Sequence, residues 1–500
     1  MKKQLPLTLT ILFIGICALT KAQGTLTPVW TKFESSSIGQ KAEGWGVSVE
    51  GNGDIYWTYN SDNLSQGLDL YCHKLDANGN QIWITPFHYG GVGNQQNYVC
   101  NAKDTFLYIG GRHCPGLVNT CDMLLLKVDK GTGTLIWDKT LDFGQNGYDE
   151  VDGLEILPDG IYCGGWSQAL EPNIYRIDIG LWKLDFNGNT IWTNSFGKTG
   201  TAEHQDGHFV VDENYIYAAG LWGGTGIANL YDGNAFLGKF SKADGSFVDS
   251  TLFGNQSSIF INAENALGMT SDGTYLYITG YTTPTANNWQ MFTAKFDKNM
   301  NPLWYHHWGG SNTESARAIA VANGYVFVGG QTLSPEYSSS SQSDAVLLVY
   351  DTTGNFIAYK TWGIPSIDEA FQDIAIHNNS IYLSGTTGTN IGVGNTDSAF
   401  VIKVDMNDII TGLSIPELPE NFTFYTYPNP FSLQTTLHTN RPLTNATLSI
   451  YNTFGQLVNQ MNSISGQTIN LQRDNLPAGL YFIHITQENK MICQKIIISD

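Results

Sequence analysis

The chain has 500 residues, of which 25 are lysine or arginine and 45 are aspartate or glutamate, which gives a formal net charge of −20. This length exceeds what one ordinary hydrophobic core supports, so we expect several domains or a repeat array. The negative charge excludes nucleic acids and anionic membrane surfaces as partners, because both bind basic patches.

Residues 1–22 are typical of a secretory signal peptide. Two lysines precede a mostly apolar run from Leu7 to Leu19, and the small residue Ala22 ends the segment. The run is short for a membrane span and polar sequence follows it, so we predict cleavage after Ala22. A lipoprotein attached through Cys17 is the less favoured alternative, because a bulky isoleucine precedes that cysteine. Without the three lysines of this segment, the chain has 22 basic and 45 acidic residues, a net charge of −23, and no apolar run that spans a bilayer.

Residues 23–411 contain a motif that recurs at a nearly constant interval. "KLDANGNQIW" at 74–83 returns as "KLDFNGNTIW" at 183–192, and looser copies occur between and after them. The intervals are 53, 56, 56, 56, 54 and 54 residues, which indicates a repeat fold of seven units. The position of the motif lysine is occupied by Lys74, Lys127, Lys183, Lys239, Lys295, Val349 and Lys403.

Each unit predicts four β-strands. A short apolar run leads into a tight turn and then into an aromatic-rich run that ends in glycine, such as "TFLYIGG" or "YLYITG". A variable loop follows, then a third run such as "DMLLLKVD", the motif turn, and a fourth strand that opens at the tryptophan. Four strands in up-and-down order make one blade of a β-propeller. We therefore predict an all-β fold, a seven-bladed β-propeller.

The two ends of the repeat region predict how the ring closes. The seventh unit ends soon after its turn, with little room for a fourth strand. The chain begins instead with an unmatched strand of that type, "TPVWTKFE", which contains Trp30. We expect this strand to complete the last blade and to protect its edge.

The motif turn has two interpretations. Its Asp, Gly and Asn residues suit a tight hairpin with a positive backbone dihedral, and the tryptophan after it can wedge between neighbouring blades. Asp and Asn oxygens at alternate positions are also ligands for Ca²⁺. A complete calcium loop with a closing glutamate is absent from the sequence. A structural turn is therefore favoured and no cofactor is predicted, with calcium as the alternative.

Six cysteines follow the signal segment, and export permits their oxidation. Cys114 and Cys121 flank a Pro-Gly turn in "CPGLVNTC", so we predict a disulfide between them. No Cys-x-x-Cys or Cys/His spacing indicates structural zinc. The other four lie in apolar, strand-like runs and are interpreted as buried thiols: Cys72, Cys100, Cys163 and Cys493.

Up-and-down order places alternate loops on the same face, and the second-to-third and fourth-to-first connections are the long ones. Binding residues concentrate on loops held by a rigid scaffold, so we expect the ligand on that face. Acidic residues precede the innermost strands and are expected to converge at the mouth of the central channel, where they hold a cation or form a solvated acidic rim. They are Asp149, Glu150, Asp152, Glu203, Asp206, Glu314, Asp368, Glu369 and Asp373.

Aromatic residues and a histidine segment are the other candidates on these loops. Exposed rings suit stacking on sugars, although packing onto the blade below is the favoured interpretation. In "HQDGH", His204, Asp206 and His208 share one side of an extended segment, which suits a metal site, against the alternative of a polar loop. The aromatic candidates are Trp166, Trp222, Tyr231 and Tyr337.

No motif identifies an enzyme. The sequence has no G-x-S-x-G, no phosphate loop and no clear Ser/His/Asp order. The leading hypothesis is a non-catalytic, exported protein that binds an extracellular glycan or protein. A polysaccharide-acting enzyme is the alternative, because two carboxylates from different blades at the propeller mouth can hydrolyse a glycoside.

Residues 25–411 resemble the secreted bacterial β-propeller repeat proteins, whose units run D-x-x-x-x-K-[LVF]-D-x-x-G-N-x-x-W. The resemblance implies the scaffold and no chemistry. "DKGTGTLIW" at 129–137 also resembles a motif of quinoprotein dehydrogenases, but those proteins repeat it and here it occurs once. A quinoprotein-like oxidoreductase is therefore the third hypothesis. The first aspartate of the pattern is present as Asp69, Asp122, Asp178 and Asp344, and is replaced by Asn234, Gln290 and Ser398.

The repeat ends at residue 411. Residues 412–422 form a proline-bearing linker, and alternating apolar residues with Pro, Asn and Gly turns in 423–500 predict a small Ig-like β-sandwich. Short motifs there resemble the type A C-terminal sorting domain of the type IX secretion system of the Bacteroidota. The resemblance implies export by the signal peptide, transport across the outer membrane by the type IX machinery, and release or surface attachment. The matching residues are Tyr427, Pro428, Asn429, Pro430, Phe431, Gly455, Gly479, Tyr481 and Lys495.

Overall fold

The computed structural model places two compact units in the chain, which separate between Ile409 and Ile410. Each unit is described by itself below. The residues that the structure describes are 24–36, 41–62, 67–87, 94–116, 120–143, 147–171, 174–197, 202–205, 207–224, 233–254, 264–285, 288–338, 342–388, 397–410, 424–452, 457–487 and 490–499.

The first unit consists of antiparallel meanders that follow one another along the chain. The first sheet contains β2 (Ala42–Val49), β3 (Ile55–Asp62), β4 (Leu68–Leu75) and β5 (Gln81–Phe87). The second contains β6 (Asn94–Lys103), β7 (Phe106–Cys114), β8 (Asp122–Asp129) and β9 (Leu135–Leu141).

A nine-stranded sheet comes next, and it is built from two meanders. One pairing, the parallel one between Ile177 and Ala202, joins them. The first meander contains β10 (Asp149–Leu157), β11 (Gly160–Glu171), β12 (Ile174–Leu184) and β13 (Thr190–Phe196). The second contains β14 (Ala202–Gln205), β15 (Val210–Val211), β16 (Tyr215–Gly224), β17 (Asn234–Ser241) and β18 (Phe247–Phe253).

Two further four-stranded sheets follow along the chain in the first unit. One contains β19 (Asn265–Ser271), β20 (Leu276–Thr285), β21 (Asn288–Phe296) and β22 (Pro302–Trp308). The other contains β23 (Glu314–Ala322), β24 (Tyr325–Thr332), β25 (Asp344–Asp351) and β26 (Phe356–Trp362).

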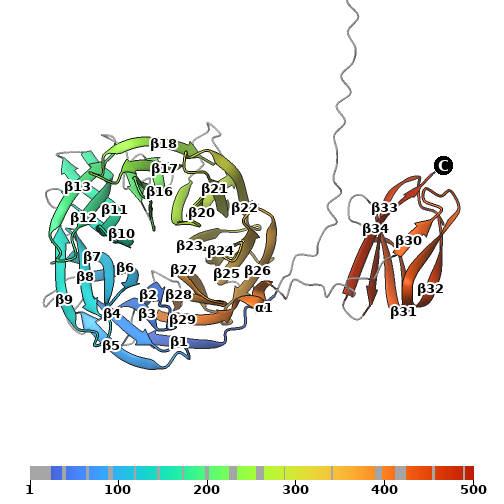
Figure 1. Cartoon of the computed structure of the whole chain (residues 1–500), viewed down its shortest axis with the longest axis horizontal. Coiled ribbons are helices and arrows are strands. Elements are labelled where there is room, and N and C mark those ends of the chain that lie inside the picture. Colours follow the sequence, from blue (N-terminus) through green and yellow to red (C-terminus); the bar gives the residue numbers. More distant parts are fainter. Residues whose placement is uncertain are drawn as a thin grey trace, which may run out of the picture. The chain divides into compact units, whose positions relative to one another are not determined.

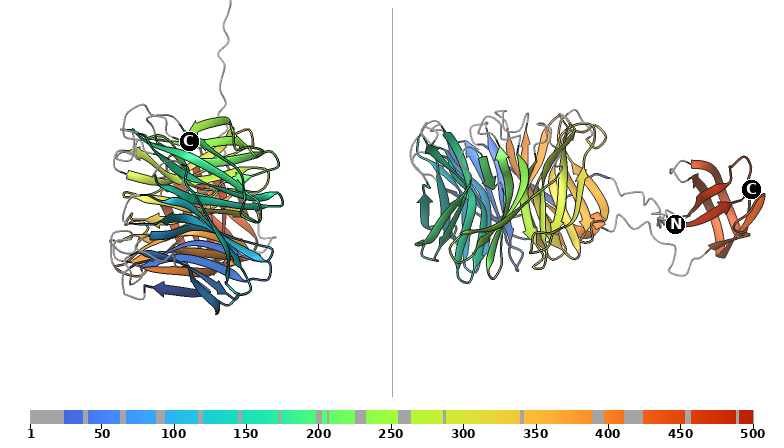
Figure 2. Two further views of the ribbon diagram at one scale, coloured as in Figure 1. Left: turned by 90° about the vertical axis from the view of Figure 1, so that its left-hand side faces the viewer. Right: turned by 90° about the horizontal axis from the view of Figure 1, so that it is seen from above.

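The last sheet is completed by the N-terminal strand. β27 (Asp368–His377), β28 (Ser380–Gly388) and β29 (Ser398–Asp405) form a meander, and β1 (Trp30–Ser35) pairs antiparallel with β29 along its whole length. Figure 1 shows the sheets arranged radially around an axis, with β2, β6, β23 and β27 inside and β5, β9, β13 and β22 outside. Seen from the side, the strands run roughly along that axis (Figure 2). This is a β-propeller, and the predicted ring closure by the Trp30 strand is confirmed.

The repeated lysine and tryptophan both contact the turn of the next sheet. Lys74 Nζ and Trp83 Nε1 donate to the same carbonyl oxygen, that of Lys130, at 3.3 and 3.1 Å. Two donors from one sheet thus hold a turn of its neighbour, which explains why the two residues recur together. The arrangement is repeated by Lys295 and Trp304 on Thr352 O, and by Lys403 and Trp30 on Ala77 O.

The motif glycine has a second role besides its backbone conformation. Gly133 has a φ of 73°, which glycine adopts without strain, and a Cβ there would lie 2.9 Å from the ring of Trp83. Only a residue without a side chain leaves room for the tryptophan of the preceding sheet. The predicted position of the tryptophan between sheets is confirmed. The same contact occurs between Gly79 and Trp30, Gly245 and Trp192, and Gly354 and Trp304.

Hydrogen bonds within the motif turn use the oxygens of its aspartate. Asp76 Oδ1 accepts from the backbone N–H groups of Asn78 and Asn80, and Oδ2 accepts from Asn80 Nδ2 at 2.9 Å. The Asn80 side chain is the main reason that the pKa of Asp76 lies below its ordinary value. Asp185, Asp297 and Asp351 have the same arrangement. Calcium binding by these turns stays a prediction.

The second unit contains one five-stranded sheet. Its order is β30-β31-β33-β34, with β32 paired to β31. A short helix, α1 (Met406–Ile410), precedes it in the chain. In the part of the chain that the structure describes, no helix is long and apolar enough to cross a membrane. The strands are β30 (Phe424–Tyr427), β31 (Gln434–Asn452), β32 (Leu457–Gln472), β33 (Gly479–Gln487) and β34 (Lys490–Ile498).

Candidate functional site

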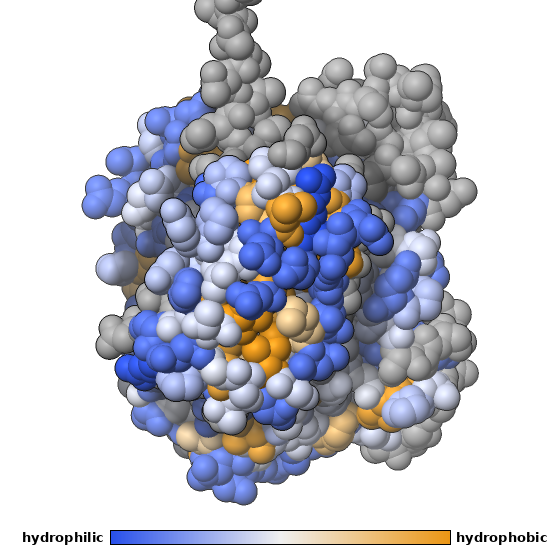
Figure 3. Space-filling view, turned by 90° about the vertical axis from the view of Figure 1, so that its right-hand side faces the viewer, coloured by the Kyte–Doolittle hydropathy of each residue, from blue (hydrophilic) through white to orange (hydrophobic). Residues whose placement is uncertain are grey.

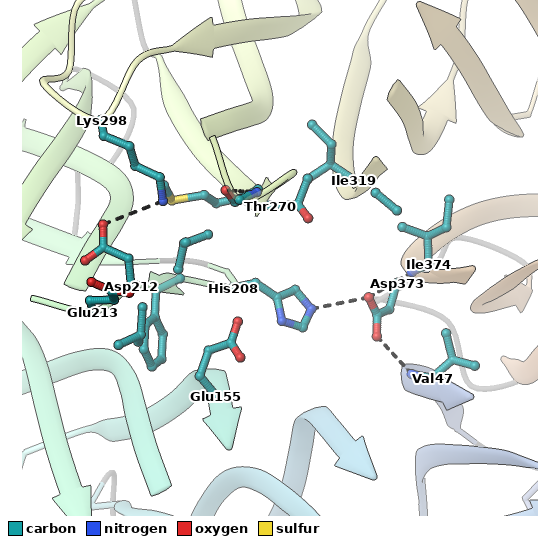
Figure 4. A pocket seen from close by; sticks show the side chains of 17 residues that line it. Val47, Glu155, His208, Asp212, Glu213, Thr270, Lys298, Ile319, Asp373 and Ile374 are labelled. Carbon is teal, nitrogen blue, oxygen red and sulfur yellow. Dashed lines mark hydrogen bonds and ion pairs between the residues drawn. The ribbon is translucent and has the colours of Figure 1, made fainter. Parts of the chain in front are cut away.

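A cavity of about 510 Å³ lies on the propeller axis (Figure 4). Its wall is formed by the innermost strands of five sheets, together with the segment 208–213. Strands that are remote in the sequence therefore surround it. We call it the channel cavity, and its main residues are Val47, Glu155, His208, Phe209, Asp212, Met269, Lys298, Ile319, Asp373 and Ile374.

The channel cavity lies toward the C-terminal ends of the innermost strands. Glu155 is near the end of β10, whereas the predicted site residues Asp149 and Glu150 are at its start. Six residues of a strand span roughly 20 Å. The cavity is therefore at the opposite end of these strands from most of the predicted acids, and among the described side chains Asp373 is the one predicted acid that lines it.

His208 and Asp373 form an ion pair across the cavity wall. His208 Nε2 lies 3.3 Å from Asp373 Oδ1. Asp373 is held in place because its Oδ2 accepts from Val47 N at 2.9 Å and its Oδ1 accepts from Ile374 N at 2.8 Å. Burial lowers the pKa of His208, but Asp373 and the nearby Glu155 raise it by more, so this pKa lies above its ordinary value. Asp373 thus fixes the position of the imidazole in the cavity wall.

Glu155 extends into the same space from β10. Figure 4 shows its carboxylate and the His208 ring entering the cavity from neighbouring parts of the wall. Burial raises the pKa of Glu155 to about 7, against the opposing influence of His208 and Lys103. A carboxyl group with such a pKa both donates and accepts protons at neutral pH.

The rest of the wall combines one further ion pair with apolar side chains. Lys298 Nζ lies 3.8 Å from Asp212 Oδ2, and burial lowers the pKa of Lys298. Val211 and Ala320 supply partly exposed apolar surface, whereas Phe209, Met269 and Ile319 are nearly fully buried. Apolar walls with a few polar groups that converge are typical of small-molecule sites.

The predicted acidic rim is not exposed, which corrects the expectation from the sequence. Each of the predicted rim acids whose side chain the structure describes accepts a hydrogen bond or forms an ion pair within the fold, as buried carboxylates require. Glu314, for example, accepts from Thr332 Oγ1 at 2.9 Å and from Gly310 N at 3.0 Å. The buried acids are Asp149, Glu150, Asp152, Glu314, Asp368, Glu369 and Asp373, none more than 9% exposed.

The partners of the other acids come mainly from backbone groups and arginines. Phe143 N donates to Asp149 Oδ2 at 2.9 Å, and Ser343 N donates to Asp368 Oδ1 at 2.7 Å. Glu150 pairs with Arg112 at 2.9 Å, and Asp152 with Arg317 at 3.6 Å. Glu369 accepts from Thr387 Oγ1 at 2.9 Å, while burial raises its pKa to about 7. Ligand binding by these acids stays a prediction.

The aromatic candidates pack against the sheets. Trp222 stacks on Phe196 and Phe236, with ring centroids 5.6 and 5.3 Å apart. Tyr337 packs on Trp308 at 4.4 Å. Trp166 stacks on Tyr148 at 6.5 Å, and Tyr231 lies outside the described residues.

Only one member of the predicted metal trio can be placed. His208 pairs with Asp373 as described above. Asp206 lies outside the described residues, as do the side chains of Glu203 and His204. Within the described residues, no three His, Cys, Asp or Glu side chains are grouped to hold a metal ion.

The structure contains a disulfide between Cys114 and Cys121. Cys72, Cys100 and Cys163 are free and buried, and burial raises the pKa of the Cys72 thiol above its ordinary value. The side chain of Cys493 lies outside the described part of the chain.

In the second unit, the "YPNPF" segment is held against the last strand. Asn429 Oδ1 accepts from Ile497 N at 2.8 Å, and Asn429 Nδ2 donates to Lys495 O at 3.2 Å. Phe431 is buried in the core of this unit, and Tyr481 donates to Pro477 O. The remaining motif residues Tyr427, Pro428, Pro430 and Gly479 are exposed, and Gly455 lies outside the described residues.

Figure 3 shows one face of the molecule, on which apolar residues form small patches among polar ones.

Comparison with known proteins assigns the tail. Residues 425–499 match the family described as the secretion system C-terminal sorting domain. This domain indicates secretion through a type IX system, with release or attachment at the cell surface. No curated protein matches the chain.

Solved structures with a similar fold include the β-propeller domain of the trilobed protease from Pyrococcus furiosus, with 9% identity, a TM-score of 0.39 and coverage of 76% of this chain and 99% of that one. Quinohemoprotein alcohol dehydrogenase from Comamonas testosteroni has 12% identity, a TM-score of 0.40 and coverage of 75% and 76%. Polysaccharide lyase Uly1 has 10% identity, a TM-score of 0.39 and coverage of 73% and 90%. At these identities the likeness concerns the fold alone.

Sequence reasoning missed Glu155, Asp212 and Lys298 as cavity residues. Glu155 lies inside the strand "DEVDGLEIL", and the other two lie in short turns between strands. The one available signal was an ionisable residue late in an innermost strand, where the pattern otherwise places apolar residues. That signal does not show which strand ends face one another.

Proposed function

We propose that this is an exported bacterial protein of the Bacteroidota, secreted or attached to the outer cell surface. Residues 1–22 would direct export across the inner membrane. Residues 423–500, predicted to be an Ig-like sandwich, would direct passage across the outer membrane by the type IX machinery, after a linker at 412–422. The family match at 425–499 and the apolar N-terminal run support this proposal.

Residues 23–411 would form seven blades of the secreted β-propeller repeat type. The seven motif copies in the sequence support this number. The two meanders of the nine-stranded sheet each have the strand order of a blade. They are joined only by the pairing of Ile177 with Ala202 among the described residues, so we count them as two blades.

Deletion of residues 425–499 tests the export proposal. In a native host, the shortened protein is expected to accumulate in the periplasm, because it lacks the sorting domain that the machinery recognises. Immunoblots of periplasm, medium and cell surface measure this, and circular dichroism of the retained protein checks that the propeller is folded. Unchanged appearance of the shortened protein outside the cell would contradict the proposal.

The propeller would bind an extracellular saccharide in the channel cavity. The observation that carries this is the cavity of about 510 Å³, within the usual range for small-ligand sites. Its carboxylates and imidazole would form hydrogen bonds with sugar hydroxyl groups, and its apolar wall would contact the face of a sugar ring. A concave site of this size favours a glycan over the flat surface of a protein partner.

Oligosaccharide binding by the full chain tests this function. A defined oligosaccharide set is expected to contain ligands that are bound and returned unchanged. His208→Ala is expected to weaken their binding about 10-fold or more, because a charge-assisted hydrogen bond contributes about 1.5–3 kcal/mol. Asp138→Asn on the outer strand β9 is the control that removes one exposed charge away from the cavity.

An enzyme remains the second candidate, because Glu155 has a pKa of about 7 and faces an ion-paired imidazole. Release of reducing ends that is abolished by Glu155→Gln would favour a polysaccharide-acting enzyme over a binding protein. Absence of binding to any saccharide, with folded protein, would contradict both.

A further inference from the structure

The channel cavity has more acidic than basic groups. Four carboxylates line it, from Glu155, Asp212, Glu213 and Asp373, whereas His208 and Lys298 are its only basic groups within the described residues. A neutral ligand leaves this imbalance in place, and an anionic ligand is repelled by it.

Two of the carboxylates already have basic partners. Asp373 pairs with His208 at 3.3 Å, and Asp212 lies 3.8 Å from Lys298. Both basic groups that line the cavity are therefore already in contact with a carboxylate. The charge that remains available to a ligand inside the cavity is therefore that of Glu155, while Glu213 is exposed in the adjoining turn.

Glu155 has no hydrogen bond or ion-pair contact to its carboxylate among the described residues. The side chain is surrounded by protein and still reachable from the cavity, toward which it points in Figure 4. Removal of a carboxylate from water is unfavourable unless a cation or donor compensates it, and this cost is what raises its pKa to about 7. The fold thus holds a carboxylate without a direct hydrogen-bond or ion-pair contact among the described residues, with His208 and Lys103 acting on it only from a distance.

The other residues that line the cavity indicate which kind of cationic ligand fits beside Glu155. Val211 and Ala320 are the partly exposed apolar residues of the lining, so they provide surface on which a ring can lie. Three carboxylates converging on one point would indicate a metal ion, but no such group exists within the described residues. A single carboxylate beside an apolar wall instead suits an ammonium group on an organic ring.

We propose that the channel cavity binds a saccharide that carries a free amino group, with Glu155 as the counter-ion of its ammonium. This inference rests on the proposed function and specifies its ligand class. The ammonium donates hydrogen bonds to the Glu155 carboxylate, and the sugar hydroxyls bond His208. Amino-sugar units with a free amine are bound in preference to their acetylated or hydroxyl counterparts.

Three oligosaccharides with the same β-1,4 backbone test the inference with the full chain at pH 7. They are chitosan oligomers with free amines, chitin oligomers with acetylated amines, and cello-oligosaccharides with hydroxyls at that position. Calorimetry is expected to show that the chitosan oligomers bind about 10- to 100-fold more tightly than the other two, as expected for one charge-assisted hydrogen bond.

Glu155→Gln is expected to remove this preference while binding of the cello-oligosaccharides changes little. Asp138→Asn on the outer strand is the matched control and is expected to retain the preference. Equal affinity for the three oligomers would overturn the amine inference and leave the saccharide function standing, whereas no binding of any would overturn both. Displacement of the oligomers by Ca²⁺ alone would also overturn the inference, because it would identify a metal as the partner of Glu155.

Discussion

Gly133→Ala is expected to lower the free energy of unfolding of the propeller by about 2–5 kcal/mol. Alanine at the φ of 73° observed there is strained by about 1–2 kcal/mol. Its Cβ would also lie 2.9 Å from the Trp83 ring and 2.5 Å from Thr85 Oγ1, and overpacking of this kind costs about 1–3 kcal/mol. Denaturant unfolding followed by tryptophan fluorescence measures the change.

Gly273→Ala is the matched control for this prediction. Gly273 has a φ of 90°, and nothing lies within 4 Å of the position that its Cβ would take. Its substitution is expected to cost only the backbone strain of about 1–2 kcal/mol. Equal losses for Gly133→Ala and Gly273→Ala would show that the close approach of Trp83 does not require glycine at position 133.

Deletion of residues 24–35 from the mature chain is expected to have the largest effect on stability. It removes β1, which pairs with β29 from Trp30 to Ser35, and it removes Leu26, which is 2% exposed. The loss of buried side chains and strand hydrogen bonds is expected to lower the free energy of unfolding by at least about 4 kcal/mol. The edge of β29 becomes free to pair with other chains, so aggregation is expected as well. Thermal unfolding and size-exclusion chromatography measure both effects.

Trp30→Ala separates the contribution of the side chain from that of the strand. This variant keeps β1 but loses the contact with Gly79 and the hydrogen bond to Ala77 O, at a cost of about 2 kcal/mol. The variant is expected to keep the oligomeric state of the intact chain, because the edge of β29 remains covered. A deletion variant with the unfolding midpoint and oligomeric state of the intact chain would refute the role of β1 in closing the ring.

The repeat made the scaffold predictable because its signals are local. The Asp, Gly and Trp of one motif lie within ten residues in "KLDANGNQIW", and each acts on its own turn or on the neighbouring one. The strand order and the ring closure by Trp30 followed from these signals. The sequence also identified Phe431 and the tail that contains it, because its short motifs are specific to sorting domains.

The acidic residues show where such reasoning failed. Asp149 and Asp368 were expected at the mouth of the central channel, where they hold a cation or form a solvated rim. Each instead accepts hydrogen bonds from a neighbouring loop, from Phe143 N and Ser343 N, respectively. Those donors lie 6 and 25 residues away, and no periodicity of the sequence reveals that they converge.

The sequence by itself determined the repeating unit, its turns and the closing strand, because strand alternation and turn chemistry act over a few neighbouring residues. It also determined that the tail is a sorting domain, because the motifs of that domain are short and local. Only the tertiary structure decided that Glu155, His208 and Asp373 meet on one axis. His208 and Asp373 are 165 residues apart in the chain, and their contact exists only because the closed ring brings the ends of its innermost strands together. The channel cavity is thus a property of the ring and not of any single repeat.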